Sequence, residues 1–259
     1  MQEAGNKKSN TSKSTLSILC NPDGFSFFAS TPKGYFPKEL KLHSPTDFPD
    51  QFENFVRMKE WAGKEDIKVS IIDFSDHFLL LPSAIGDEEH IKTFLNFQYL
   101  HEEEYQIFTA PLCDEKQIFC WEIPSSRDQC FERLFPNLTL LSSSYILANW
   151  VIRQAILLRQ STLIAHLYGK SMHLFVADTQ KLLFANSFPI NNHPEMSYFI
   201  LRCMEQLSLN PVQTRCFICT KYVSGQPITE IFSPYIRHIE MAEFTHSEEE
   251  PLQIIDKKS

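Results

Sequence analysis

Hydrophobic positions in the second half of the chain form three short runs that follow one another closely. The runs are Leu163–Leu167, Met172–Ala177 and Leu182–Phe188, and they are rich in residues that favour strands. Turn-compatible residues separate them at Tyr168-Gly169-Lys170 and at Asp178-Thr179-Gln180. This alternation of apolar runs and turn residues predicts three consecutive β-strands.

The N-terminal part of the chain shows the same pattern. Leu16–Cys20 and Phe25–Ser30 flank a Pro22-Asp23-Gly24 turn, and Tyr35–His43 supplies a weaker third run. The second run of this set is similar in character to the run that starts at Met172. We therefore interpret the two segments as copies of one unit, which indicates an internal duplication.

Helical periodicity follows each set of three strands. A first helix is expected to start at Thr46 or Asp47 and to end at Gly63, and a second one covers Pro194–Leu207. A helix over Ser144–Arg159 is apolar on nearly all sides, which is typical of a helix buried between layers. We interpret it as the connector between the two halves. The expected apolar face of the first helix consists of Phe48, Phe52, Phe55 and Val56.

The first half also carries elements that the second half lacks. They comprise a strand at Phe78–Leu81, a short helix capped by Asp87, and a strand pair at Tyr105–Ala110 and Gln117–Ile123. We interpret them as an insertion at about residues 76–123. A helix then follows, and its predicted capping box consists of Ser125 and Asp128.

These patterns predict a definite domain organisation. The segments are a disordered tail at 1–15, a first lobe at 16–143 with its insertion, a connector helix and second lobe at 144–242, and a charged tail at 243–259.

Composition favours a packed globular protein. The 259 residues include 22 phenylalanines, enough large apolar side chains for a sizeable core. The net charge of −8 argues against nucleic acid as a partner. The odd number of seven cysteines is typical of reduced thiols. We find no signal-like stretch in residues 1–15, and Arg153 interrupts the longest apolar run, so we expect a cytoplasmic protein with no transmembrane segment.

Each half reads in the order of three strands, helix, strand, helix and strand, which resembles the ribonuclease H-like unit duplicated in the actin-like ATPase superfamily. Short motifs carry a closer resemblance to one family from Bacteroidetes, DUF3822, described only as a domain of unknown function. The match covers about residues 16–240. The motifs are Leu16-Ser17-Ile18, Asp23-Gly24-Phe25-Ser26-Phe27, Phe78–Pro82, Phe94–Phe97, Leu134–Asn137, Ser142–Ser144, Asn186–Phe188, Tyr198–Leu201 and Gln206-Leu207.

That family is similar to actin-like proteins, including the cytosolic type IV pilus assembly protein of this fold. The resemblance implies an α/β, duplicated ribonuclease H-like two-lobe fold with mixed sheets, in a bacterial cytoplasm. It implies no reaction.

In active actin-like proteins each half presents a hairpin turn to the nucleotide phosphates. Such a turn needs an aspartate for the hydrated metal, glycines for close backbone approach, and hydroxyl groups. Here the first turn keeps Asp23 and Gly24, but Pro22 has no N–H to donate, and the second has no aspartate. The candidate ligand-binding residues are Asp23, Gly24, Ser26, Gly169, Lys170 and Ser171.

Ordinary explanations compete with phosphate binding at both turns. Asp23-Gly24 is also a common hairpin turn, and Lys170-Ser171 is also a plain polar turn between strands. Around Cys219–Gly225, where active proteins place glycines near the adenine, a single glycine remains and Tyr222 would crowd a base. With only seven glycines in the chain, we disfavour ATP with magnesium as a cofactor and expect none.

Other catalytic or metal-binding patterns are weak. Cys216 and Cys219 have C-x-x-C spacing, but on a strand they point to opposite faces and cannot share a metal. His166 and His173 are expected to meet on neighbouring strands, without an evident third ligand. We therefore predict no catalytic residue and no metal site.

Three functional hypotheses follow. The first is a degenerate actin-like protein, a pseudoenzyme that binds a protein partner or acts as a scaffold without hydrolysing ATP, through the inter-lobe cleft or the insertion. The second is a nucleotide-binding ATPase or phosphotransferase with a site rebuilt from Asp23, Lys170 and Ser171. The third is a cytosolic adaptor docked on a membrane assembly. The partner's identity and the oligomeric state stay open.

Overall fold

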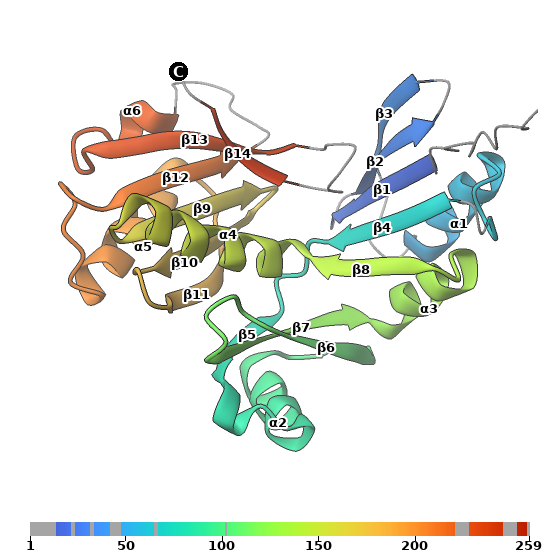
Figure 1. The fold of residues 1–259 in the computed structure, drawn as a ribbon, viewed down its shortest axis with the longest axis horizontal. Helices are drawn as coiled ribbons and strands as arrows, with labels where there is room; N and C mark the ends of the chain where they lie inside the picture. The colour runs from blue at the N-terminus through green and yellow to red at the C-terminus, as the bar shows by residue number, and fades with distance from the viewer. Residues whose placement is uncertain are drawn as a thin grey trace, which may run out of the picture.

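The structure is a computed structural model that describes residues 14–21, 24–31, 34–41, 48–64, 67–101, 103–220, 228–245 and 253–257. It has two lobes, each built on a mixed sheet, with a third small sheet beneath them (Figure 1). The α/β two-lobe fold predicted from the sequence is confirmed.

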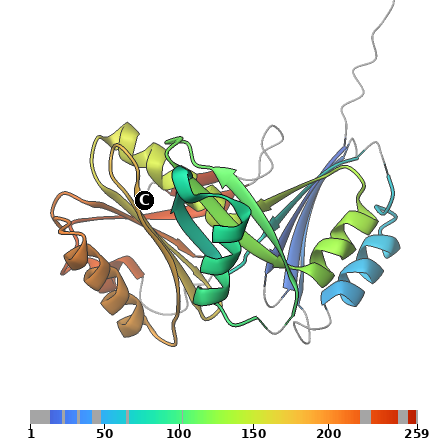
Figure 2. The same ribbon diagram turned by 90° about the horizontal axis from the view of Figure 1, so that it is seen from below.

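The first lobe contains a five-stranded sheet in the order β3-β2-β1-β4-β8. The first three strands pair antiparallel with one another, whereas β4 runs parallel to β1 and β8 runs parallel to β4. Two helices, α1 (Phe48–Met58) and α3 (Ser125–Leu134), lie side by side on one face of this sheet (Figure 2). The strands are β1 (Ser14–Asn21), β2 (Gly24–Thr31), β3 (Gly34–Lys41), β4 (Ile67–Asp73) and β8 (Leu138–Ser142).

The second lobe repeats this order in a six-stranded sheet, β11-β10-β9-β12-β13-β14. Its first five strands have the same relative directions as the five strands of the first sheet. Helices α5 (His193–Gln206) and α6 (Ile228–Phe232) belong to this lobe. The strands are β9 (Thr162–Tyr168), β10 (Ser171–Ala177), β11 (Leu182–Pro189), β12 (Arg215–Thr220), β13 (His238–Thr245) and β14 (Gln253–Lys257).

The insertion forms a separate antiparallel sheet with the order β5-β7-β6. One hydrophobic face of this sheet contributes to a core shared with the second lobe. Phe78, Phe119 and Trp121 share one core with the connector helix and with Phe175 of β10. The insertion therefore packs on the second lobe although it lies in the first half of the sequence. Its elements are β5 (Phe78–Pro82), a 3-10 turn at Ser83–Ile85, α2 (Glu88–Gln98), β6 (Tyr105–Pro111) and β7 (Gln117–Pro124).

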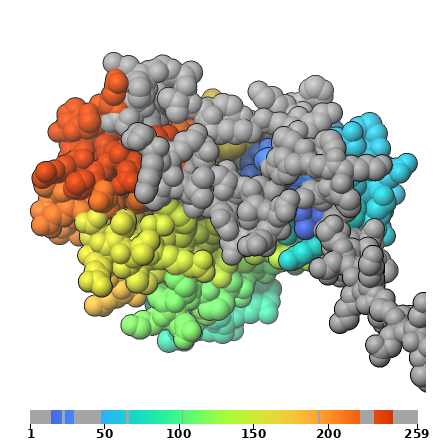
Figure 3. Space-filling view, turned by 45° about the horizontal axis from the view of Figure 1, so that its top comes forward, coloured from blue at the N-terminus to red at the C-terminus, as the bar shows by residue number. Residues whose placement is uncertain are grey.

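The connector helix α4 (Ser143–Leu158) joins the two lobes. Ser142 caps it, because the side-chain oxygen accepts hydrogen bonds from the backbone N–H groups of Ser144 and Tyr145 at 3.1 and 3.3 Å. The predicted burial holds for one face only, since Ile156 and Leu157 near the C-terminal end are exposed. In Figure 3 the yellow surface of α4 is continuous with the green surface of the insertion.

Phenylalanine side chains fill the core of the first lobe. The ring of Phe25 on β2 lies 5.9, 5.1 and 5.6 Å from the rings of Phe48, Phe52 and Phe55 on α1, all in edge-to-face geometry. The apolar face predicted for this helix is thus confirmed, because all four expected residues are buried.

Several local expectations differ from the structure. Ser125 does not cap α3: the N-cap is Pro124, which has no side chain that can accept a hydrogen bond. Helix α1 ends at Met58 rather than at Gly63, because Glu60 already adopts a left-handed backbone conformation with φ of 55°. The sequence predicts a strand over Val212–Cys219, but β12 begins only at Arg215, because a turn closed by Asn210 precedes it.

Some predictions lie partly outside the described residues. Residues 1–13 of the predicted tail, Asp23 in the first turn, and Tyr222 are outside them. In the stretch where a charged tail is expected, β14 pairs antiparallel with β13. No helix in the described ranges is long and apolar enough to span a membrane.

Candidate functional site

The carboxyl ends of the central strands of the two sheets meet between the lobes. In Figure 1 the arrowheads of β4 and β8 point towards the second lobe, and that of β9 points towards the first. The ring of Phe74, which follows β4, lies 5.3 Å from the ring of His166 and 5.5 Å from that of Tyr168, both on β9. Loops at such strand ends are where α/β proteins commonly place their ligand sites.

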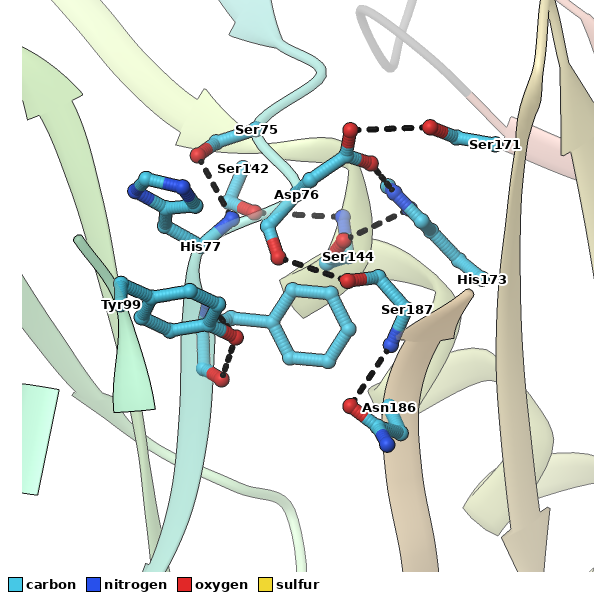
Figure 4. Close-up of polar contacts among 11 residues, drawn as sticks. Ser75, Asp76, His77, Tyr99, Ser142, Ser144, Ser171, His173, Asn186 and Ser187 are labelled. Atoms are coloured by element: carbon cyan, nitrogen blue, oxygen red, sulfur yellow. Dashed lines mark hydrogen bonds and ion pairs between the residues drawn. The ribbon is translucent and has the colours of Figure 1, made fainter. Parts of the chain in front are cut away.

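Asp76 lies at the centre of a polar network at this junction (Figure 4). Its carboxylate accepts a hydrogen bond of 2.9 Å from Ser171 Oγ and contacts His173 Nε2 at 2.5 Å. Its backbone carbonyl accepts a third hydrogen bond from Ser187 Oγ at 2.9 Å. The segment that leaves β4 is thereby bound to two strands of the second lobe.

The network extends to the connector helix. Nδ1 of His173, which is buried on β10, lies 3.0 Å from Ser144 Oγ in the first turn of α4. Burial raises the pKa of Asp76, but the hydrogen bonds from His173 and Ser171 and the charge of His173 outweigh it and hold the pKa below its usual value. The network therefore joins an anionic carboxylate after β4 to β10 and β11 of the second lobe and, through His173, to α4.

His166 pairs with His173 across β9 and β10, and their ring centroids are 6.0 Å apart. This confirms the prediction that the two histidines meet. Burial and the neighbouring charge of His173 lower the pKa of His166 to about 3. The His166 ring is therefore neutral at physiological pH and brings no positive charge to the junction.

A second carboxylate, Asp73, ends β4 and is fully buried. Its Oδ1 lies 2.7 Å from Nη1 of Arg127 on α3, and the guanidinium of that arginine stacks 4.2 Å above the ring of Phe48. Burial raises the pKa of Asp73 despite the opposing charge of Arg127. Arg127 thus already neutralises this carboxylate within the first lobe.

The predicted phosphate turns divide between the two sheets. Gly24 and Ser26 are buried on β2, whereas Gly169 and Lys170 form the turn between β9 and β10, and Ser171 is the first residue of β10. Glycine is favoured at position 169, because its φ of +55° lies in the left-handed region. Lys170 is exposed at the tip, and Ser171 donates to Asp76. That these residues bind a ligand stays a prediction.

Sequence reasoning missed a second group of polar residues next to Asp76. His77, His101 and Glu122 offer ligand atoms that all lie within 4.8 Å of one another. They are separated by 24 and 21 positions in the chain, so no short spacing motif marks them. In the sequence, Asp76 marks only the approximate start of the predicted insertion.

The C-x-x-C pair behaves as predicted. Cys216 and Cys219 lie in two different cores on opposite faces of β12, and burial raises the pKa of Cys216 to about 12. All seven cysteines fall within the described residues and are free thiols, of which Cys113 is exposed.

A sequence model of one protein family matches residues 3–239. The chain belongs to this family, DUF3822. The family is described as proteins of unknown function, so membership in DUF3822 does not indicate which activity the chain has. Comparison with curated proteins gives no match.

Solved structures establish the fold of this DUF3822 chain. A protein from Bacteroides thetaiotaomicron, described as having an actin-like ATPase fold and unknown function, is similar with a TM-score of 0.76 and 17% identity, over 91% of this chain and 93% of its own. A type IV pilus biogenesis complex of PilM and PilN is similar with a TM-score of 0.58 and 10% identity, over 88% of this chain and 87% of the matched one. The chain has the actin-like ATPase fold.

Proposed function

We propose that this DUF3822 chain is a protein-binding or scaffold module that does not hydrolyse ATP. The observation that carries the proposal is that polar groups at the lobe junction already bind one another. Ser171, the hydroxyl of the second turn, donates to Asp76, and Asp76 also contacts His173. A hydroxyl and a carboxylate bound in this way are not free to hold a phosphate and its hydrated cation.

The state of Asp73 supports the same conclusion. A carboxylate that holds a hydrated magnesium ion keeps its oxygens open to water or to the ion. Asp73 is instead buried against Arg127, whose positive charge would repel a cation. Among the described residues, Asp73 at the end of β4 and Asp76 just after it thus both have partners inside the chain.

A thermal-shift titration with ATP and magnesium tests this part of the proposal. Because a ligand that binds only the folded state raises the melting temperature, the proposal predicts no change. A clear stabilisation at micromolar nucleotide would instead favour an ATPase or phosphotransferase. In that case Asp23→Asn and Lys170→Ala should each weaken nucleotide binding without lowering the stability of the ligand-free protein.

The insertion offers the surface for a protein partner. Phe97 on α2 and Leu100 just after it are 91% and 95% exposed, which is unusual for two large apolar side chains so close together. We propose that a partner protein covers them. A Phe97→Ser/Leu100→Ser variant should lose the partner that co-purifies with the wild type. Tyr198→Ser, which removes an exposed aromatic side chain on α5, should retain it. Retention by both variants would refute this surface.

A role as an adaptor on a membrane assembly is the second candidate, and the likeness to a PilM–PilN complex favours it. The proposed setting is the cytoplasm, with the protein docked on a membrane-bound partner. Membrane fractionation of cells that express the chain is the test. A wholly soluble pool without a co-purifying membrane protein would exclude the adaptor role and leave the scaffold proposal standing.

A further inference from the structure

Two histidines and a glutamate converge at one end of the insertion sheet. His77 directly precedes β5, Glu122 lies on the central strand β7, and His101 follows α2. The backbone N–H of Glu122 donates to the carbonyl of His77 at 3.2 Å, which extends the pairing of β5 with β7. The sheet itself therefore holds two of the three side chains next to each other.

The three side chains lie close enough to share one metal ion, because their ligand atoms are all within 4.8 Å of one another. Nδ1 of His77 lies 3.4 Å from Glu122 Oε2, and Nε2 of His101 lies 2.7 Å from the same oxygen. Ligand atoms around a tetrahedral zinc ion are about 3.3 Å apart when each bond is about 2.0–2.1 Å long. His77 and Glu122 already have that spacing, and His101 needs to withdraw by only about 0.6 Å as a cation replaces the shared proton.

The burial of Glu122 and the missing hydrogen bond of His77 also favour metal binding. Glu122 is 2% exposed, and a buried carboxylate needs compensating charge or strong donors. His77 Nδ1 is buried and makes no hydrogen bond.

Aromatic side chains enclose the group and fix the two rings. Tyr99 stacks on His77 with ring centroids 4.2 Å apart, and its hydroxyl is held by hydrogen bonds with both the N–H and the carbonyl of Phe78. The ring of Tyr105 lies 4.9 Å from that of His101. Figure 4 shows that His77 points away from Asp76, so this group is distinct from the network at the lobe junction. Such preorganised ligands reduce the cost of binding an ion.

We propose that His77, His101 and Glu122 form a binding site for a divalent transition-metal ion, with Zn²⁺ as the best fit. Two imidazoles and one carboxylate suit zinc and its neighbours, whereas Mg²⁺ and Ca²⁺ prefer oxygen ligands. Three protein ligands leave the fourth position of a tetrahedral ion open to water or to a ligand. A bound ion would join the ends of α2, β5 and β7 and so stabilise the insertion.

Zinc binding to metal-free full-length protein tests this proposal. After treatment with a chelator, equilibrium dialysis should show one Zn²⁺ per chain, and the melting temperature should rise with Zn²⁺ concentration. Addition of Co²⁺ should give the visible absorption of a four-coordinate site. Failure of the wild type to bind Zn²⁺ would overturn the proposal.

Matched variants separate this site from adventitious binding. His101→Gln and Glu122→Gln should each weaken Zn²⁺ binding by at least about 100-fold, since each removes a direct ligand. His90→Gln is the control, because His90 contacts Asp87 at 2.5 Å elsewhere in the insertion and lies outside the group. Cys113→Ser, which removes the exposed thiol, should also leave binding unchanged.

The His101→Gln variant distinguishes loss of a metal ligand from a folding defect, because His101 is the less buried of the two substituted ligands. The His101 side chain is 17% exposed, against 3% for Glu122, so His101→Gln is expected to keep the far-ultraviolet circular dichroism spectrum of the wild type. Loss of Zn²⁺ binding in that folded variant supports the site. Equal Zn²⁺ binding by His101→Gln and the wild type would refute it.

Discussion

Replacing Arg127 by methionine tests how much its ion pair with the buried carboxylate of Asp73, at the end of β4, contributes to the free energy of unfolding. The Asp73 side chain is 1% exposed and its Oδ2 is buried without a hydrogen bond, so Arg127 supplies the counter-charge through the 2.7 Å contact to Oδ1. Removing one partner of a buried ion pair costs about 3–5 kcal/mol, because the other charge is left uncompensated. We expect Arg127→Met to lower the free energy of unfolding by this amount at pH 7.

The pH dependence of that loss identifies its cause. Without Arg127, burial and the negative charge of Asp76 act on Asp73 unopposed and raise its folded-state pKa further above the unfolded value. Between those two pKa values the folded protein holds a proton that the unfolded chain has lost, so stability falls as pH rises. The slope is about 1.4 kcal/mol per pH unit for one proton. Lowering the pH from 7 to 5 should therefore recover at most about 2.7 kcal/mol relative to the wild type.

Urea denaturation followed by tryptophan fluorescence measures both quantities. Adding Asp73→Asn to Arg127→Met should restore most of the lost stability, because the amide carries no charge to bury. Arg133→Met is the control. Arg133 on α3 forms an exposed ion pair with Glu53 on α1, and losing this pair should have little effect on stability. An Arg127→Met variant that loses less than about 1 kcal/mol, with no dependence on pH, would refute this reasoning.

Three further predictions concern pH, the core and a helix cap. As the pH decreases below about 6.5, His166 takes up a proton in the unfolded chain but not in the folded protein, where its pKa is about 3, so this group lowers stability by about 1.4 kcal/mol for each pH unit of decrease. In urea titrations, the stability of His166→Phe should therefore fall less steeply with decreasing pH than that of the wild type. An unchanged slope would contradict this prediction. Phe52→Ala should cost about 3–5 kcal/mol in the same assay, because Phe52 is fully buried against Phe25, and a loss below about 1 kcal/mol would show that the core is packed differently. Ser142→Ala should cost about 1–2 kcal/mol by leaving the N–H groups of the first turn of α4 without their cap, and a neutral effect would argue against the cap.

The fold was predictable because local patterns and topology agree. Runs of apolar residues around the Tyr168-Gly169-Lys170 break predicted three strands, and helical spacing predicted a buried face on α1 that the structure confirms. Helix and strand ends were less predictable, because they depend on single turns such as the one that Asn210 closes before β12.

The polar sites were largely unpredictable from the sequence. The meeting of His166 and His173 could be foreseen since a tight turn fixes the register of β9 and β10. Asp76 and Ser171 are 95 positions apart, and their contact depends on how the lobes pack rather than on any local pattern. The same holds for His77, His101 and Glu122, which three separate elements of the insertion bring together.

The central claim is that residues at the lobe junction bind one another instead of a nucleotide. Isothermal titration calorimetry of the full chain with ATP and magnesium measures this most directly. We predict only the heat of dilution, because Ser171 and Asp76 are already partners and Asp73 is held by Arg127. A saturable binding curve that Lys170→Ala weakens would contradict the account.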